Sequence, residues 1–260
     1  MIELRGRRAV VSGASRGIGA ATVRLLARAG ADVMVGYRSR ASEAEAVAAE
    51  ARAAGVRAAT CGADLTTPEG CDALVGAAVD AFGGVDVVVV NHGVWPAEEV
   101  PVAAMDDARW HRTVREDLDS VFWLSRAAAR ALTRAVAGRA ARDGGRLVLV
   151  SSTAGQRGEA LHADYAATKG AMISFVKSLA VELAPAGVTV NCVAPGWVDT
   201  EMTSSAMDAG GRERIAATIP VGRVATADDV AGPILFLCSP FARHVTGEVL
   251  NVNGGSVLCG

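Results

Sequence analysis

The chain has 260 residues, of which 51% are hydrophobic and 4% aromatic, and its 26 basic and 28 acidic side chains give a formal net charge of −2. This length suits one large domain or two small ones, and the balanced charge excludes an overall field that would attract nucleic acid or an anionic membrane. Short apolar runs exclude a membrane span and a signal peptide, and five cysteines without a CxxC pair argue against a disulfide scaffold, so we expect a cytoplasmic protein.

Short runs rich in β-branched residues alternate with longer alanine-rich segments along the chain. The alternation predicts strands at 9–12, 32–36, 56–60, 85–90, 146–151, 188–193 and 248–251, and helices at 17–29, 42–54, 68–82, 106–137, 165–184 and 227–237. Unbroken apolar runs at 87–90 and 147–150 are typical of parallel strands covered on both faces. We therefore predict one α/β domain over residues 1–260, a doubly wound parallel sheet of about seven strands with helices on both faces. The weakly patterned segment 200–218 is expected to form a mobile flap.

A glycine-rich loop follows the first predicted strand and opens directly into a helix. Glycine permits a tight turn and a close approach of the backbone to a pyrophosphate, while the helix N-terminus supplies free N–H groups and partial positive charge. In this position the pattern predicts a dinucleotide-binding loop, although an ordinary strand–helix turn is the alternative. The predicted cofactor-binding residues of the loop are Gly13, Ser15, Arg16, Gly17, Ile18 and Gly19.

The end of the second predicted strand indicates which dinucleotide binds. An NAD site usually has a carboxylate there for the ribose hydroxyls, whereas an NADP site needs positive charge for the 2′-phosphate. The sequence reads Tyr37-Arg38-Ser39-Arg40 and contains no carboxylate, and Arg16 lies in the glycine loop. Guanidinium groups and a hydroxyl suit a phosphate dianion, so we predict that Tyr37, Arg38 and Ser39 bind NADP(H). The alternative is that these arginines only solvate the surface of an arginine-rich protein.

Three side chains form a candidate catalytic set. Tyr165 and Lys169 lie at i and i+4 of a predicted helix and therefore share one face. Ser152 follows the fifth predicted strand, at the carboxyl edge where open α/β sheets bind ligands. A random Tyr-x-x-x-Lys is rare in a chain with two tyrosines and two lysines, which disfavours the alternative of a core tyrosine beside a surface lysine.

With these motifs in order, the chain resembles the short-chain dehydrogenase/reductase family almost end to end. Further matches are Asp64-Leu65, Asn91-His92-Gly93, 191–196 and 253–255, and the segment 110–125 is most similar to the branch that contains the 3-oxoacyl-acyl-carrier-protein reductases. The resemblance implies a Rossmann-type fold and a homotetramer. Separately, the four histidines lack metal-ligand spacing, so we expect no metal. It adds these residues to the cofactor site: Asp64, Leu65, Asn91, Gly93, Tyr165, Lys169, Pro195, Gly196, Val198 and Thr200.

The chain departs from the family pattern near the fourth strand and on the helix that follows. Val90 replaces an Asn, His92 replaces an Ala, and Asp117 replaces the Asn that belongs to the family's catalytic set. If Asp117 ionises near Lys169, it will pair with the lysine and weaken its effect on Tyr165. The hypothesis is that Asp117 joins the catalytic residues and makes the pH dependence more alkaline; the alternative is a carboxylate that caps a helix or faces solvent.

The residue types imply reduction of a carbonyl by hydride transfer. Ser152 would donate a hydrogen bond to the carbonyl oxygen and Tyr165 its proton, with Lys169 lowering the pKa of Tyr165. A 3-oxoacyl thioester is the first expectation for the substrate, with a small-molecule alcohol, sugar or secondary metabolite as the alternative. A non-catalytic NADP sensor is a third reading, but such proteins lose the tyrosine or the lysine. No nucleic acid or membrane partner is expected. Trp95, Trp197, Met202 and Met207 either line the substrate pocket or pack the flap.

Overall fold

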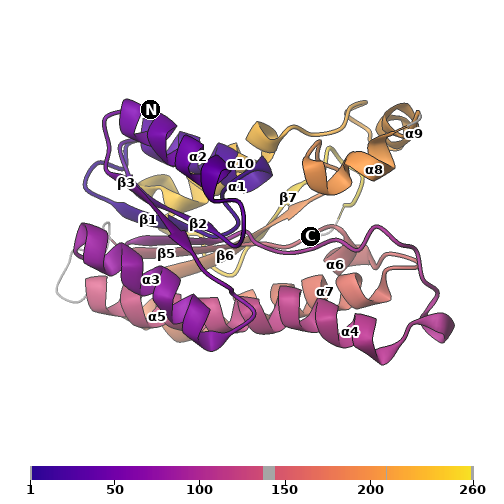
Figure 1. Cartoon of the computed structure of the whole chain (residues 1–260), viewed down its shortest axis with the longest axis horizontal. Coiled ribbons are helices and arrows are strands. Elements are labelled where there is room, and N and C mark those ends of the chain that lie inside the picture. The colour runs from indigo at the N-terminus through magenta and orange to yellow at the C-terminus, as the bar shows by residue number, and fades with distance from the viewer. Residues whose placement is uncertain (1, 137–143, 209, 259–260) are drawn as a thin grey trace.

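The computed structural model describes residues 2–136, 144–208 and 210–258. Within them, parallel strands form a 7-stranded sheet with the order β3-β2-β1-β4-β5-β6-β7 (Figure 1). Because β1 and β4 are neighbours, the chain reverses its direction of winding between them, and this point is where such sheets bind ligands. The doubly wound, parallel Rossmann-type fold is therefore confirmed. The strands are β1 Arg8–Val11, β2 Asp32–Tyr37, β3 Ala58–Gly62, β4 Val87–Val90, β5 Gly145–Val150, β6 Val188–Pro195 and β7 Val249–Val252.

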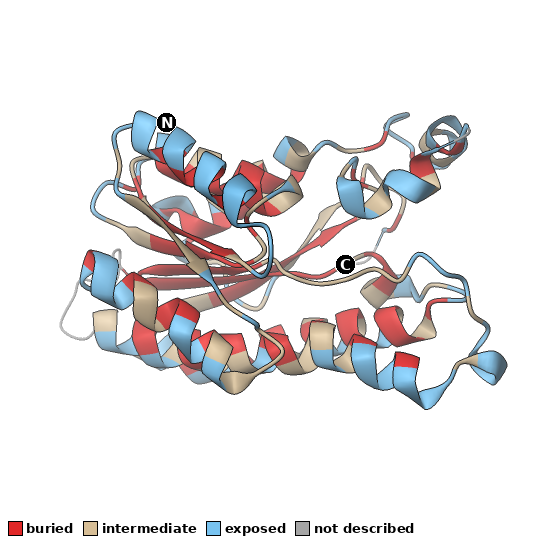
Figure 2. Cartoon of the chain, viewed as in Figure 1, coloured by how far each residue is buried: buried red, intermediate tan, exposed pale blue. Residues whose placement is uncertain are grey.

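Helices cover both faces of the sheet (Figure 1). One face packs against α1 (Gly17–Arg28), α2 (Ala41–Ala53) and α10 (Ala227–Cys238), whereas α3 (Pro68–Phe82), α5 (Ser120–Val136) and α7 (Ala163–Leu183) cover the other. Figure 2 shows buried residues concentrated in the sheet and on the inner helix faces, with exposed residues on the outer helix faces. The two cores are separate because each strand sends alternate side chains to opposite faces.

Strand β4 has no polar residue because both of its faces are buried. Val88 and Val90 belong to the core under α3, α5 and α7, whereas Val87 and Val89 belong to the core under α1, α2 and α10. All four side chains are fully buried. Each buried valine contributes about 1.5–3 kcal/mol relative to an exposed one, so a polar residue at any of these positions would weaken one of the two cores.

The helix predicted at 106–137 is instead three segments. They are α4 (Asp107–Val114), a π-helical turn at Arg115–Asp119 and α5, and residue 137 lies outside the described residues. A π turn has i→i+5 hydrogen bonds and is frequently found at functional sites. The sequence also missed the short helix α6 (Ala154–Arg157). The predicted flap contains η5 (Glu201–Thr203), α8 (Ser204–Met207) and α9 (Gly211–Ala217).

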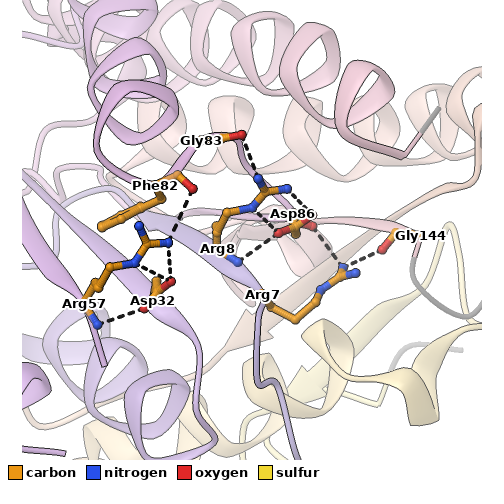
Figure 3. Close-up of polar contacts among 8 residues, drawn as sticks. All are labelled: Arg7, Arg8, Asp32, Arg57, Phe82, Gly83, Asp86 and Gly144. Atoms are coloured by element: carbon orange, nitrogen blue, oxygen red, sulfur yellow. Dashed lines mark hydrogen bonds and ion pairs between the residues drawn. The ribbon is translucent and has the colours of Figure 1, made fainter. Parts of the chain in front are cut away.

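Arginine–carboxylate pairs join the amino ends of the strands (Figure 3). Asp86, just before β4, accepts hydrogen bonds from the backbone N–H and the guanidinium of Arg8 at 2.7–3.0 Å. Arg7 donates to the carbonyl oxygen of Gly144 at 2.6 Å. Arg57 pairs with Asp32 at 2.7 Å and lies over the ring of Phe82. We call these residues the amino-end network.

None of the helices in the described part of the chain is long and apolar enough to cross a membrane. Cys61, Cys71, Cys192 and Cys238 are free thiols, and Cys259 lies outside the described residues.

Candidate active site

A cavity of about 360 Å³ lies at the carboxyl ends of the strands and is bordered by the loops that follow β1 to β6. This volume is within the range of about 300–1,000 Å³ typical of small-molecule sites. Gly19 and Asp117 do not line it, but the other predicted site residues do. These residues are Gly13, Ser15, Arg16, Gly17, Ile18, Tyr37, Arg38, Ser39, Asp64, Leu65, Asn91, Gly93, Ser152, Tyr165, Lys169, Pro195, Gly196, Val198 and Thr200.

The candidate catalytic side chains meet in this cavity. Tyr165 and Lys169 are both buried on α7, and the Lys169 Nζ atom lies 5.5 Å from the centre of the Tyr165 ring. Lys169 Nζ also donates to the carbonyl oxygen of Val150 at 3.5 Å, at the end of β5. The Ser152 hydroxyl accepts a hydrogen bond from the Ala154 N–H at 3.1 Å and lies close enough to Tyr165 to act on the pKa of its phenol. The fold thus brings together Ser152, Tyr165 and Lys169, as their spacing in the sequence predicted.

Close backbone packing fixes the position of Lys169. A Cβ atom at Gly155 in α6 would lie 2.5 Å from the carbonyl carbon of Lys169, so only glycine permits this contact. The Ser151 hydroxyl donates to the carbonyl oxygen of Lys169 at 2.9 Å. Helix α7 is thus held against the end of β5 at the residue whose ammonium group enters the cavity.

Burial raises the pKa of Tyr165, the nearby charge of Asp117 raises it further, and only the neighbouring Ser152 hydroxyl opposes this. This differs from the expectation that Lys169 lowers the pKa of Tyr165. The physical reason is that removing a phenolate from water disfavours the charged form of a buried group. At neutral pH the phenol therefore carries its proton, which is the form required of a proton donor.

Asp117 lies in the π turn and is fully buried. Its Oδ1 atom accepts a hydrogen bond from the Val94 N–H at 2.7 Å, whereas Oδ2 has no hydrogen-bond partner among the described residues. Burial raises the pKa of this carboxyl to about 6, and the charge of Lys169 partly opposes the shift. A Cβ atom at Gly93 would lie 3.0 Å from Asp117 Oδ1 and 3.1 Å from Lys169 Nζ. The two groups thus border the same small space, yet the described ion pairs do not include one between them.

His92 ties the π turn to the ends of two strands. The Ser120 hydroxyl donates to the carbonyl oxygen of Glu116 at 2.7 Å, so it accepts from His92 Nε2 at 2.9 Å. His92 Nδ1 is then an acceptor for the Ser12 hydroxyl, 2.8 Å away. Burial lowers the pKa of His92 to about 3, so the ring is neutral as this arrangement requires. The substitution of His for the family's Ala thus positions the turn that carries Asp117.

A second polar network, which the sequence did not indicate, anchors the first turn of α7. Asp164 precedes Tyr165 and is fully buried. It accepts hydrogen bonds from Arg109 Nε at 3.0 Å and from the Thr113 hydroxyl at 2.8 Å. Arg109 also donates to the carbonyl oxygen of Glu98 at 2.8 Å. Helix α4, the loop after β4 and the start of α7 are thereby joined beside the candidate catalytic tyrosine.

The glycine loop fits a dinucleotide. A Cβ atom at Gly13 would lie 2.9 Å from the His92 Cα atom, and one at Gly19 would lie 2.4 Å from the carbonyl oxygen of Gly13. Arg16, the N-cap residue of α1, is extended and makes no side-chain cap. The N–H groups of the first helical turn are thus available to an anion. Gly19 therefore serves the packing of the loop, whereas Gly13, Gly17 and Arg16 border the cavity.

Three arginines of the cavity lining each pair with a carboxylate. Arg16 and Arg40 both contact the carboxylate of Glu201, Arg40 at 3.3 Å. Arg38 lies 3.4 Å from the carboxylate of Glu116. This set of guanidinium groups fits a dianionic phosphate, and all three line the cavity.

Aromatic side chains form another part of the cavity wall. Trp95 lies edge-on to Trp197 with ring centres 5.7 Å apart and stacks on His162 at 5.1 Å. Trp95, Trp197 and Met202 line the cavity, whereas Met207 is buried in a small core with Ile219 and Val224. Of the two alternatives that the sequence left open, lining the pocket applies to Trp95, Trp197 and Met202, whereas packing applies to Met207. In the described part of the chain, no group of three or more His, Cys, Asp and Glu side chains could hold a metal ion.

Known proteins are similar to this chain over almost its full length. A family model described as Enoyl-(Acyl carrier protein) reductase matches residues 13–256. The chain is 39% identical over 257 residues to a 3-oxoacyl-acyl-carrier-protein reductase of Vibrio cholerae, covering 99% of this chain and 100% of that protein. It is also 39% identical over 251 residues to L-rhamnose 1-dehydrogenase (NAD(P)(+)) of Azotobacter vinelandii, covering 95% of this chain and 94% of that protein.

A crystal structure from Brucella melitensis, titled as a short-chain dehydrogenase/reductase of the glucose/ribitol dehydrogenase type, has a TM-score of 0.88 at 35% identity and covers 99% of each chain. The full-length matches confirm the family that the sequence motifs predicted. The chain thus belongs to the short-chain dehydrogenase/reductase family, oxidoreductases that act on CH–OH or C=O groups with a nicotinamide cofactor.

Proposed function

We propose that the protein is an NADP(H)-dependent carbonyl reductase in which Ser152, Tyr165 and Lys169 are the catalytic residues. The observation that carries the proposal is the meeting of a hydroxyl, a buried phenol and a buried ammonium group in one cavity that also contains the glycine loop. A lone tyrosine or lysine would not support it. The sensor alternative is disfavoured because all three groups are present and share the cavity.

The bound nicotinamide would supply a hydride to the carbonyl carbon of the substrate. Ser152 would donate a hydrogen bond to the carbonyl oxygen, where negative charge develops. The phenol of Tyr165 would transfer its proton to that oxygen, which leaves a phenolate beside the ammonium group of Lys169. The Lys169 Nζ atom lies 5.5 Å from the centre of the Tyr165 ring. Its positive charge stabilises the phenolate more than the phenol, so Lys169 favours the proton transfer. General acid catalysis of this kind contributes about 10²–10⁴-fold to a rate.

Asp117 completes this proposal as a charge-tuning residue of the site. It does not line the cavity, but its charge acts on both Tyr165 and Lys169. With a pKa of about 6, the carboxyl is mostly ionised at neutral pH and then opposes formation of the phenolate. This supports the hypothesis of a more alkaline pH dependence, through the charge of Asp117 rather than through an ion pair with Lys169.

NADP(H) is proposed over NAD(H) because Arg16, Arg38 and Arg40 surround one end of the cavity without an acidic residue at the end of β2. Arg38→Gln should weaken NADPH binding by about tenfold or more and leave NADH binding within about twofold, since only NADPH carries the 2′-phosphate. Equal losses for both dinucleotides would contradict the assignment of this arginine to the 2′-phosphate.

A 3-oxoacyl thioester is the first proposed substrate, in line with the reductase of Vibrio cholerae. The second candidate is a ring-shaped alcohol or sugar. It is favoured by the walls formed by Trp95 and Trp197, because flat aromatic rings pack well against ring substrates, and by the similarity to a rhamnose dehydrogenase. An NADPH-oxidation assay with 3-oxoacyl thioesters and cyclic ketones, and an NADP⁺-reduction assay with sugars, tests both. The thioester proposal predicts the highest kcat/KM for the thioesters, and a preference for ring substrates would replace it with the second candidate.

The family resemblance also leads us to propose a homotetramer. Trp110 on α4 and Phe122 on α5 are 38% and 44% exposed, which supports a contact between subunits on this side of the chain. Light scattering should give four chains per particle. A monomer of full activity would contradict the proposal.

A further inference from the structure

Glu201 occupies a place that the phosphate of a cofactor would need. It follows Thr200 at the start of the predicted flap, far in sequence from both the glycine loop and the end of β2. The same oxygen of its carboxylate, Oε2, contacts the guanidinium groups of Arg16 and Arg40. A single anionic oxygen between two guanidinium groups is the arrangement that a bound phosphate oxygen would also form.

The start of the flap also lies against the glycine loop itself. A Cβ atom at Gly17 would lie 3.4 Å from the Thr200 methyl group. Thr200 and Thr203 form reciprocal capping hydrogen bonds around the turn that contains Glu201. The Thr203 hydroxyl in addition donates to the carbonyl oxygen of Val198 at 2.6 Å. These bonds hold Glu201 on a short ordered turn, so its carboxylate is directed to the arginines by a defined backbone.

We propose that Glu201 is a specificity-determining residue for the dinucleotide: in the free enzyme its carboxylate binds Arg16 and Arg40, and a 2′-phosphate must displace it. The inference rests on the proposed function, because it assumes that these arginines receive the 2′-phosphate of NADP(H). It assigns Glu201 two effects. The carboxylate competes with the phosphate, and its displacement releases the segment 200–207 from the glycine loop.

The strength of this competition follows from exposure. The side chains of Arg16, Arg40 and Glu201 are 43%, 42% and 56% exposed, so water screens both pairs and each contributes little to stability. A phosphate dianion has more charge and more acceptor oxygens than a carboxylate, and it therefore displaces Glu201. NADH has only a ribose hydroxyl at this position and cannot replace the carboxylate as a partner of the arginines. Glu201 thus weakens NADPH binding modestly. It also holds the segment 200–207 against the glycine loop as long as no 2′-phosphate displaces it.

Glu201→Gln tests the competition, with Glu213→Gln on α9 as the matched control. Both substitutions remove one negative charge from the predicted flap, but only the first removes the carboxylate that Arg16 and Arg40 share; Arg40 keeps its pair with Glu43 in both variants. Titration of the enzyme with NADPH and with NADH should show that Glu201→Gln tightens NADPH binding by about three- to tenfold and changes NADH binding by less than about twofold. Glu213→Gln should change neither by more than about twofold.

Hydrogen exchange on the enzyme without a dinucleotide tests the anchoring. The amides of 201–207 should exchange at least about threefold faster in Glu201→Gln than in the wild type, and Glu213→Gln should leave their exchange unchanged. Unchanged exchange, or an equal change in affinity for NADPH and NADH, would overturn the inference and leave the proposed function intact. If the wild type binds neither dinucleotide, the proposed function fails and the inference fails with it.

Discussion

Arginine–carboxylate pairs lie at both ends of the strands, but the two sets have different surroundings. In the amino-end network, Asp86 is fully buried and receives hydrogen bonds from a backbone N–H and from two guanidinium nitrogens of Arg8. At the carboxyl end, Glu201 is 56% exposed and contacts arginines that line a cavity. The same chemistry therefore supports the fold at one end, where the carboxylate is buried, and leaves solvent-exposed arginines available to a ligand at the other.

The two ends also differ in how completely their acids are satisfied. Both carboxylate oxygens of Asp86 accept hydrogen bonds, whereas Asp117 Oδ2, near the candidate catalytic lysine, has no described partner. A buried polar atom without a partner is unfavourable, and such atoms are rare in folded proteins. The carboxyl end thus keeps an unfavourable group with a perturbed pKa, which is typical of functional sites.

The largest expected effect is a loss of activity from a substitution at the carboxyl ends of the strands. Lys169→Met removes the ammonium group beside Tyr165, so kcat should fall by about 10²–10⁴-fold because the phenolate formed during reduction loses its stabilising charge. The free energy of unfolding should change little, because the substitution affects the reaction and not the fold. Steady-state kinetics and urea unfolding on the same preparation measure both, and a variant with more than a tenth of the wild-type kcat would contradict the role of Lys169.

Asp86→Ala should have the opposite pattern. Removing the buried carboxylate leaves Arg8 without its charged partner, and breaking such a pair costs about 3–5 kcal/mol of the free energy of unfolding. The folded fraction should keep its kcat, because the network lies at the far end of the strands from the cavity. Urea unfolding checks the loss, and a destabilisation below about 1 kcal/mol would show that the amino-end network is not a stabilising clamp.

Asp117→Asn should change how stability depends on pH. The carboxyl has a pKa of about 6 in the folded protein against 3.8 as its ordinary value, so the folded state binds more protons between pH 4 and 6. The wild-type free energy of unfolding therefore falls as pH rises through this window, by at most about 3 kcal/mol, and the variant should lack this fall. Urea unfolding of both proteins at several pH values measures the difference, and parallel curves would contradict the raised pKa.

The same variant should shift the pH–rate profile. The charge of Asp117 raises the pKa of Tyr165, so Asp117→Asn should move the alkaline limb of kcat to lower pH. Wild-type and variant profiles that coincide would remove Asp117 from the proposed site.

Arg57→Gln should have the smallest effect. Arg57 belongs to the amino-end network, but its side chain is 58% exposed and its pair with Asp32 is screened by water. The free energy of unfolding should fall by less than about 1 kcal/mol. A loss as large as that of Asp86→Ala would show that burial does not explain the difference within the network.

The sequence predicted the sheet well because its strands are specified by local patterns. The run at 87–90 has no polar position, and β4 is buried on both faces for that reason. The break between α4 and α5 could not be predicted, because it depends on hydrogen bonds that join His92, Ser12 and Ser120 from segments distant in sequence. Local helix propensity alone gives one continuous helix there.

In the candidate site, too, local spacing was predictable and contacts between distant segments were not. The spacing of Tyr165 and Lys169 on one helix, and a serine at the end of β5, were sufficient to predict their meeting. The environment of Asp117 was not predictable, because burial depends on what packs around the π turn. Nor could the sequence indicate that Glu201 contacts Arg16 and Arg40, since an exposed carboxylate has no sequence pattern that identifies its partners.

The most direct test of the account compares dinucleotide binding with turnover in Tyr165→Phe. This change removes only the phenolic hydroxyl and preserves the ring beside Lys169. The account predicts that the variant binds NADPH within about threefold of the wild type, while kcat for the best carbonyl substrate of the wild type falls by at least about 10²-fold. A variant that binds NADPH normally and keeps a kcat within tenfold of the wild type would contradict the role of Tyr165 as the proton donor, and with it the proposed mechanism.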